Sequence, residues 1–241
     1  MWKSLSANGV IANGDDPHVV ETLEGIDYTT FGLCIQNTVH PENISLDWRH
    51  MDVMCNDAFY CHLDLKVIGK HNALNALAAV AAAWKLGIPG EAVSEGLKTF
   101  GGADRRMQYK GNFNGADVYD DYAHHPDELR ATIEAVRTMK YDRVVIAFQP
   151  HTYTRTHALF DDFVKELSKA DVLVLAEIYA ARERNTVGIS SRDLQTQIPG
   201  SVYCRTLPQV TDYLRSIAGP GDVILTVGAG DIFRAGEALL K

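Results

Sequence analysis

The hydrophobic pattern of the chain changes at Gly101-Gly102, a glycine pair of the kind that separates periodic segments. Upstream of the pair, short apolar runs predict a mixed set of strands and helices. The elements expected there are strands at 10–12, 28–34, 44–48 and 58–67 and helices at 17–23, 71–86 and 90–100. In the last of these strands every second residue is apolar, so Phe59, Cys61 and Leu63 are expected on one buried face.

Downstream of the pair, strands and helices alternate regularly. Residues 144–148 and 172–175 are continuously apolar, which indicates strands that are buried on both faces. We therefore predict an α/β domain with an open parallel sheet and helices on both of its faces. The expected strands are 117–121, 143–148, 171–176, 201–204 and 222–227, and the expected helices are 126–139, 156–169, 190–197, 208–218 and 230–240.

Composition, charge and cysteine spacing narrow the class of protein. The 241 residues are 46% hydrophobic and 22% charged, as in an ordinary globular protein. The formal net charge is −8 and no basic patch stands out, so a nucleic-acid partner is not expected. The four cysteines have neither zinc nor disulfide spacing, and the longest apolar stretch, 73–84, is too short to span a bilayer. We expect a cytoplasmic protein with no membrane partner.

The unusual polar residues follow the predicted strands of the second part. In a doubly wound sheet, ligands bind beyond the carboxyl ends of the strands. The segments that carry most of the titratable and aromatic side chains are 120–127, 149–156, 177–184 and 228–232, and each follows a predicted strand. This grouping predicts a functional site at one edge of the sheet.

Several of these residues also have a purely structural explanation. Asp120 and Asp121 could close a turn, and the histidines of 124–125 could precede a helix that begins at Pro126. Two adjacent histidines can bind a metal, but no Cys or further His lies at ligand spacing, so no metal site is expected. Gly228-Ala229-Gly230 lacks the third glycine of a dinucleotide-binding motif.

Other residues point more directly to a ligand. His151 and Arg155 enter a helix, where a cation is unfavourable unless an anion is bound, and this favours an anionic ligand. Asn72 and Asn75 open an alanine-rich helix, where they could cap it or bind an adenine edge. Arg105, just after the glycine pair, could be solvated or could reach phosphates. The residues by themselves thus predict a small-anion or nucleotide site on an α/β domain.

Five segments together resemble the Mur ligases, the ATP-dependent amide ligases of peptidoglycan precursor synthesis. These segments are 13–17, 69–75, 120–127, 148–156 and 228–232. Within the family, 149–156 is similar to the member that adds L-alanine to UDP-N-acetylmuramate. The alternatives are the murein tripeptide recycling ligase, which shares the Asp-(Phe/Tyr)-Ala-His-His-Pro stretch, and a non-catalytic nucleotide-binding module.

The resemblance implies a domain organisation. Residues 1–102 correspond to the end of a central ATPase domain, and residues 103–241 to a C-terminal Rossmann-like ligase domain with a doubly wound, mostly parallel sheet. The P-loop, the Mg²⁺ ligands and the UDP-sugar site of the family lie upstream and have no counterpart in these residues. We therefore expect the chain to be inactive alone, to bind ATP weakly and to self-associate through its first hundred residues.

The resemblance also implies a nucleotide site. His71, Asn72 and Asn75 would hold the adenine, and Arg105 would contact the phosphates of ATP. Asp121 would hold the ribose hydroxyls, although Asp120 fits equally by position.

The remaining roles concern the amino acid. Tyr122, His124, His151 and Arg155 would surround alanine and the new amide, with Arg155 pairing the free carboxylate. His124, His151 and Arg155 are the expected catalytic residues, acting where the alanine amine attacks an acyl phosphate that ATP forms on muramate. Thr152 stands where some members have Arg, so one cationic contact to the substrate is lost or replaced.

Overall fold

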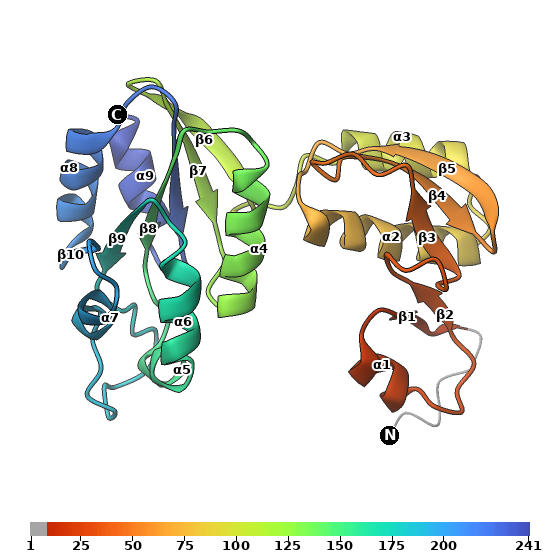
Figure 1. The fold of residues 1–241 in the computed structure, drawn as a ribbon, viewed down its shortest axis with the longest axis horizontal. Coiled ribbons are helices and arrows are strands. Elements are labelled where there is room, and N and C mark those ends of the chain that lie inside the picture. Colours follow the sequence, from red (N-terminus) through yellow and green to blue (C-terminus); the bar gives the residue numbers. More distant parts are fainter. Residues whose placement is uncertain (1–8) are drawn as a thin grey trace. The chain divides into compact units, whose positions relative to one another are not determined.

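The computed structural model describes residues 9–241, and the chain forms two compact units, Met1–Gly101 and Gly102–Lys241 (Figure 1). Each unit has its own sheet and its own hydrophobic core. In residues 9–241, no helix has both the length and the apolar character needed to cross a membrane.

The first unit contains a mixed five-stranded sheet in the order β1-β2-β3-β4-β5. Strands β1 to β3 are parallel, and β3, β4 and β5 are antiparallel. Its elements are β1 (Ile11–Asn13), α1 (Pro17–Thr22), β2 (Thr29–Phe31), β3 (Val39–Glu42), β4 (His50–Cys55), β5 (Ala58–Asp64), α2 (Lys70–Lys85) and α3 (Gly90–Thr99). Helix α2 buries Ala73, Leu77 and Val80 in the core, and it is followed by Gly87 with a φ of 70°, a conformation in which glycine commonly ends a helix.

The predicted strand at 44–48 is wrong, because these residues form the turn between β3 and β4. The hydroxyl of Ser45 accepts the backbone N–H groups of Arg49 and His50, and Asp47 also accepts that of Arg49. Trp48 has a φ of 64°, which no strand residue adopts. Hydrogen bonds from backbone N–H groups to these side chains therefore replace the strand pairing that the apolar residues predicted.

The predicted position of Phe59 on the buried face is also wrong. The register of β4 and β5 shifts between Val53, opposite Cys61, and Met54, opposite Phe59. Tyr60 is the extra residue of this bulge, so the alternation of side chains is interrupted. Phe59 is 63% exposed, whereas Cys61 is buried as expected.

The second unit contains a six-stranded sheet in the order β10-β9-β8-β11-β7-β6. All neighbouring pairs are parallel except β6 and β7. Its elements are β6 (Gln108–Phe113), β7 (Ala116–Asp121), α4 (Pro126–Arg137), β8 (Arg143–Phe148), α5 (Tyr153–Ala158), α6 (Phe160–Leu167), β9 (Val172–Ala176), α7 (Ser191–Gln197), β10 (Val202–Cys204), α8 (Leu207–Ile217), β11 (Asp222–Val227) and α9 (Phe233–Leu239). The predicted mostly parallel α/β fold is confirmed.

Helices cover both faces of this sheet, as the continuously apolar strands predict. Helices α4, α6 and α7 pack on one face, against residues that include Ile146 and Phe148 of β8. Helices α8 and α9 pack on the opposite face, against Val145 and Ala147 of the same strand (Figure 1). Successive residues of one strand thus belong to two cores, which is the reason for its unbroken apolar run.

Two local features of this unit differ from the prediction. Strand β6 was not expected, although Asn114-Gly115, with φ values of 52° and 85°, forms the two-residue hairpin turn to β7. The single helix expected at 156–169 is two helices, because Leu159 leaves helical geometry with a φ of −114°.

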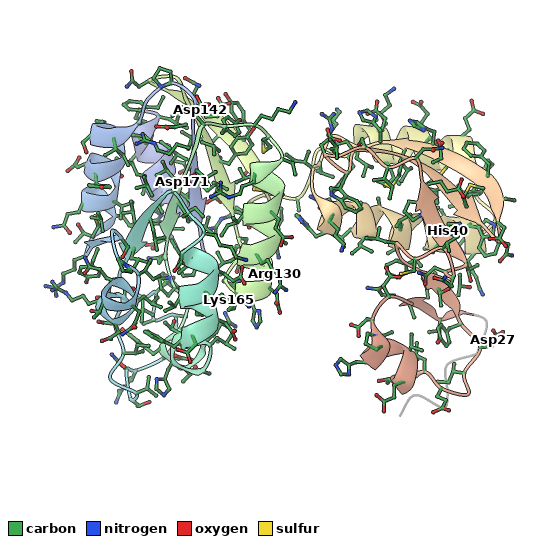
Figure 2. All side chains as sticks on the ribbon, viewed as in Figure 1. Asp27, His40, Arg130, Asp142, Lys165 and Asp171 are labelled. Carbon is green, nitrogen blue, oxygen red and sulfur yellow. The ribbon has the colours of Figure 1, made fainter. Side chains whose placement is uncertain are left out.

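An ion pair with a buried carboxylate connects the amino ends of β8 and β11. Figure 2 labels Asp142 and Asp171 at this end of the sheet, where β8 and β9 begin. Arg143 donates two hydrogen bonds to the buried carboxylate of Asp222, at 2.8 and 2.6 Å, and a third to a backbone carbonyl. These bonds hold the pKa of Asp222 below its usual range, so the ionised carboxylate is the form that stabilises the fold.

Replacing Asp222 is expected to make stability less dependent on pH. Asp222→Asn should lower the free energy of unfolding by about 2 kcal/mol at neutral pH, because charged hydrogen bonds are lost. In the unmodified chain this contribution is present above the unfolded pKa of about 4 and is lost as the pH falls through the lower folded pKa. All three tryptophans lie in the first unit, so tryptophan fluorescence would not report unfolding of the second unit. The stability of the second unit in urea should instead be measured by amide hydrogen exchange in β8 and β11.

The control is Asp212→Asn, which removes an exposed ion pair with Arg215 in the same unit. It should change the free energy of unfolding by less than about 0.5 kcal/mol. Equal effects of the two substitutions would contradict the role given to Asp222.

Candidate active site at the carboxyl ends of the strands

Strand order brings the segments of interest together. The carboxyl ends of β9, β8, β11 and β7 are neighbours, because these strands are adjacent in the sheet. Backbone hydrogen bonds continue beyond the strands: Gly228 donates to Asp121, and Tyr179 donates to Pro150. The four segments at 120–127, 149–156, 177–184 and 228–232 therefore form one edge.

Arg105 connects two of these segments. Its guanidinium donates to Asp120 at 2.8 Å and to the carbonyls of Gly228 and Gly230 at 2.7 and 3.2 Å. The same group lies over the ring of Tyr122, 4.9 Å from the centroid. Three of its five N–H donors are thus used within the protein, and two remain for a ligand.

The two adjacent aspartates are both buried, but they have different partners. Asp120 accepts hydrogen bonds from Arg105 and from the hydroxyl of Thr226. Asp121 accepts the backbone N–H groups of Met107 and Ala123, at 2.8 and 2.7 Å. Burial raises the pKa of Asp121 despite these bonds. Both side chains organise the edge from within the fold.

His151 and Arg155 carry buried polar atoms that no described residue satisfies. The Nδ1 atom of His151 and the Nη1 atom of Arg155 have no hydrogen-bond partner in residues 9–241. A buried polar atom without a partner costs about 1–3 kcal/mol. Burial, followed by the charge of Arg155, lowers the pKa of His151, so its ring is neutral at physiological pH. Such a pair is typical of a site that a ligand completes.

The backbone beside His151 is held in an unusual conformation. Thr152 has a φ of 69° and a ψ of 143°, close to a region that is almost confined to glycine. Its N–H donates to the carbonyl of Tyr179 at 2.9 Å, and its carbonyl accepts from Thr156. The extension of β8 alongside β9 thus fixes the turn that presents His151 and Arg155.

Aromatic rings connect the predicted substrate residues. His151 stacks on Tyr179, with centroids 5.7 Å apart and planes at 22°. His124 meets His151 at 6.0 Å and Tyr122 at 5.5 Å, both edge to face. The structure therefore brings the predicted residues Tyr122, His124 and His151 into one cluster.

Two residues that the sequence analysis did not single out complete this edge. Gln149 accepts the backbone N–H groups of Asp231 and Ile232 and donates to the carboxylate of Asp231. Tyr179 supports the ring of His151. Both lie in segments that the sequence marks, but their contacts require β8 to lie between β9 and β11.

The remaining predicted residues belong to the first unit. His71, Asn72 and Asn75 lie in the first turns of α2, which begins after Gly69 at a φ of 99°. Asn72 donates to the carbonyl of Ile68 at 2.8 Å, and Asn75 is exposed. Asn72 thus stabilises the start of the helix.

The structure supports no metal site in the part of the chain that it describes. Across residues 9–241, no three His, Cys, Asp or Glu side chains are grouped so that they could hold an ion.

Comparison with known proteins places this geometry in a family. Residues 105–230 match the family described as Mur ligase, glutamate ligase domain, and residues 2–83 match the Mur ligase middle domain. The chain belongs to the Mur ligase family. The resemblance found in the sequence is confirmed, and the edge described above lies almost entirely in the first of these matches.

Relatives and solved structures agree with this membership. A UDP-N-acetylmuramate--L-alanine ligase of Agathobacter rectalis is 42% identical, over 99% of this chain and 54% of that protein. One of Lachnospira eligens is 49% identical, over 74% of this chain and 40% of that protein. The crystal structure of a UDP-N-acetylmuramate-alanine ligase from Thermotoga maritima has a TM-score of 0.76 and 28% identity, over 96% of this chain and 50% of that one. This Mur ligase chain thus spans about half the length of these relatives.

Gly230 provides a test of the packing behind His151. A Cβ atom there would lie 2.7 Å from Cγ of Tyr179 and would also collide with Gln149. Gly230→Ala should therefore lower the free energy of unfolding by about 1–3 kcal/mol, since both neighbours must move. Urea unfolding followed by amide exchange in β11 measures the effect.

The matched control is Gly219→Ala in the same unit, where the new Cβ would have its nearest neighbour at 3.9 Å. Its effect should stay within about 0.5 kcal/mol. If Gly230→Ala is equally mild, Tyr179 and Gln149 are not held as described.

Proposed function

We propose that this chain forms the amino-acid side of the active site in an ATP-dependent ligase that joins L-alanine to UDP-N-acetylmuramate. Relatives named for this activity match 99% and 96% of the chain, which supports the proposal. Because ATP and a UDP-sugar are the proposed substrates, we place the enzyme in the cytoplasm.

The unpartnered guanidinium atom of Arg155 is the observation that carries the proposal. A guanidinium offers hydrogen bonds in a planar fork that fits a carboxylate. The α-carboxylate of an amino acid would satisfy the buried Nη1 atom, for which residues 9–241 provide no acceptor. Arg155 lies close enough to His151 to lower its pKa, so an amino acid bound there would have its amine near a neutral imidazole.

The proposed reaction requires such an imidazole. ATP would convert the muramate carboxylate to an acyl phosphate, and the amine of alanine would displace the phosphate. An ammonium group has no lone pair, so a proton acceptor must take its proton before attack. His151 and His124, with ring centroids 6.0 Å apart, would flank the amine. Positioning and charge stabilisation would supply most of the catalysis.

We also propose nucleotide contacts for each unit taken by itself. His71, Asn72 and Asn75 would hold the adenine from the start of α2. Asp121 would bind the ribose through lone pairs not used by the two backbone N–H groups, and Arg105 would reach the phosphates with its two remaining donors.

Replacing Arg155 tests the proposed alanine site. In the product of the complete reading frame that contains this chain, Arg155→Lys should raise KM for L-alanine about 100-fold, because a charged hydrogen bond worth about 2–3 kcal/mol is lost. KM for ATP should change less than about twofold, since Arg155 is not assigned to the nucleotide. Release of ADP in the presence of UDP-N-acetylmuramate measures both constants.

Arg184→Lys is the control, because Arg184 is an exposed arginine in the neighbouring segment at 177–184. An unchanged KM for alanine in Arg155→Lys would refute the carboxylate contact. Preference of the unmodified protein for the murein tripeptide over alanine would refute the proposed substrate and support the recycling ligase.

A further inference from the structure

Glu128 is a carboxylate at this edge to which the proposed reaction gives no role. It is the third residue of α4, and its Oε2 atom accepts the backbone N–H groups of His124 and His125, at 2.9 and 3.2 Å. These donors and the nearby charges lower the pKa of Glu128 although burial opposes them, so it is ionised. The start of the helix therefore holds this negative charge in one place.

The hydrogen bond to the carbonyl of Tyr122 and the nearby carboxylate of Glu128 together determine which nitrogen of His124 carries a proton. Nδ1 of His124 lies 3.2 Å from Oε2 of Glu128 and 3.0 Å from the carbonyl oxygen of Tyr122. Both neighbours are acceptors without a hydrogen of their own, so Nδ1 must be the donor. In the neutral ring, Nε2 is then left with its lone pair.

The neighbouring histidine has the opposite arrangement. Nδ1 of His125 accepts the backbone N–H of Asp127 at 3.3 Å, which caps α4. An accepting Nδ1 carries no proton, so a neutral His125 is protonated at Nε2. Two adjacent histidines thus hold opposite tautomers, because Nδ1 of His124 donates to the carbonyl of Tyr122 whereas Nδ1 of His125 accepts a backbone N–H, although the carboxylate of Asp127 lies 3.6 Å away.

Among residues 9–241, two titratable rings also contact His124. His151 faces it from the segment after β8, and Tyr122 lies beside it. Arg106, before β6, reaches the other oxygen of Glu128 at 3.5 Å. Glu128 is therefore the carboxylate that contacts this imidazole, and its position is fixed by α4.

We propose that Glu128 is a positioning residue that, together with the carbonyl of Tyr122, holds His124 as the Nδ1–H tautomer and so presents Nε2 to the substrate amine. This inference rests on the proposed function for the identity of the amine. The ammonium N–H bond breaks and its proton passes to Nε2 of His124. The freed lone pair forms the new C–N bond with the acyl phosphate, the phosphate leaves with the electrons of the C–O bond, and the nitrogen gives its second proton to the departing phosphate.

The test replaces Glu128 with its neutral isostere. Glu128→Gln keeps an oxygen that can accept the two backbone N–H groups, since glutamine also fits a capping box. Nitrogen NMR of the imidazoles in this chain, without substrates, should show His124 as Nδ1–H and His125 as Nε2–H. In Glu128→Gln, the Nδ1–H fraction of His124 should fall, because a neutral amide oxygen attracts the N–H less strongly than a carboxylate does, while His125 keeps its tautomer.

Kinetic constants of the product of the complete reading frame distinguish a role of Glu128 in positioning His124 from a role in packing alone. Glu128→Gln should lower kcat at least about 10-fold and leave KM for ATP and alanine within about twofold, because proton transfer and not binding is affected. Asp127→Asn is the matched control, as Asp127 is the preceding, exposed carboxylate of α4 and contacts His125 instead. It should change neither the tautomer of His124 nor kcat.

Each outcome decides the inference. An Nε2–H form of His124 in the unmodified chain, or an unchanged Nδ1–H fraction in Glu128→Gln, would overturn it. A lower Nδ1–H fraction with an unchanged kcat would also overturn it, since Nε2 would then not be the acceptor. Failure of the unmodified protein to ligate alanine would instead refute the proposed function, because the NMR measurement needs no substrate.

Discussion

The second unit depends on the position of one strand, β11, which inserts between β7 and β8. This last strand pairs along its length with both neighbours, so segments more than a hundred residues apart meet at its carboxyl end. Arg105 can reach Gly228 and Gly230, and Gln149 can hold Asp231, only because of this order. Backbone hydrogen bonding in the sheet is thus what assembles the candidate site.

The two ends of this sheet differ in how well their polar groups are satisfied. At the amino end, Arg143 donates two hydrogen bonds to the buried carboxylate of Asp222, and the contact serves stability. At the carboxyl end, His151 and Arg155 keep buried atoms without partners among the described residues, beside the constrained backbone of Thr152. A folded unit whose polar groups are hydrogen-bonded at one end can retain polar groups without partners at the other end. A ligand that supplies hydrogen bonds to those groups gains the most binding free energy.

The start of α4 links the architecture to the proposed chemistry. A helix needs acceptors for its first N–H groups, and here His125 and Glu128 provide them. The same carboxylate faces Nδ1 of His124, so a capping contact also orients an imidazole. The proposed reaction would need such an imidazole, since an amine must lose a proton before it attacks.

The sequence by itself determined those helices and strands whose burial or ends can be recognised from neighbouring residues in the chain. Continuous apolar runs identified the strands buried on both faces, Pro126 marked a helix start, and strand direction placed the polar segments at one edge. The sequence pattern did not predict the bulge at Tyr60 or the edge strand β6. The Asn114-Gly115 pair, which is typical of a hairpin turn, could have indicated β6. The tertiary structure alone decided the order of the strands and the partners of Arg105 and His151. The physical reason is that a side-chain pattern records burial and direction locally, whereas adjacency depends on hydrogen bonds between distant segments.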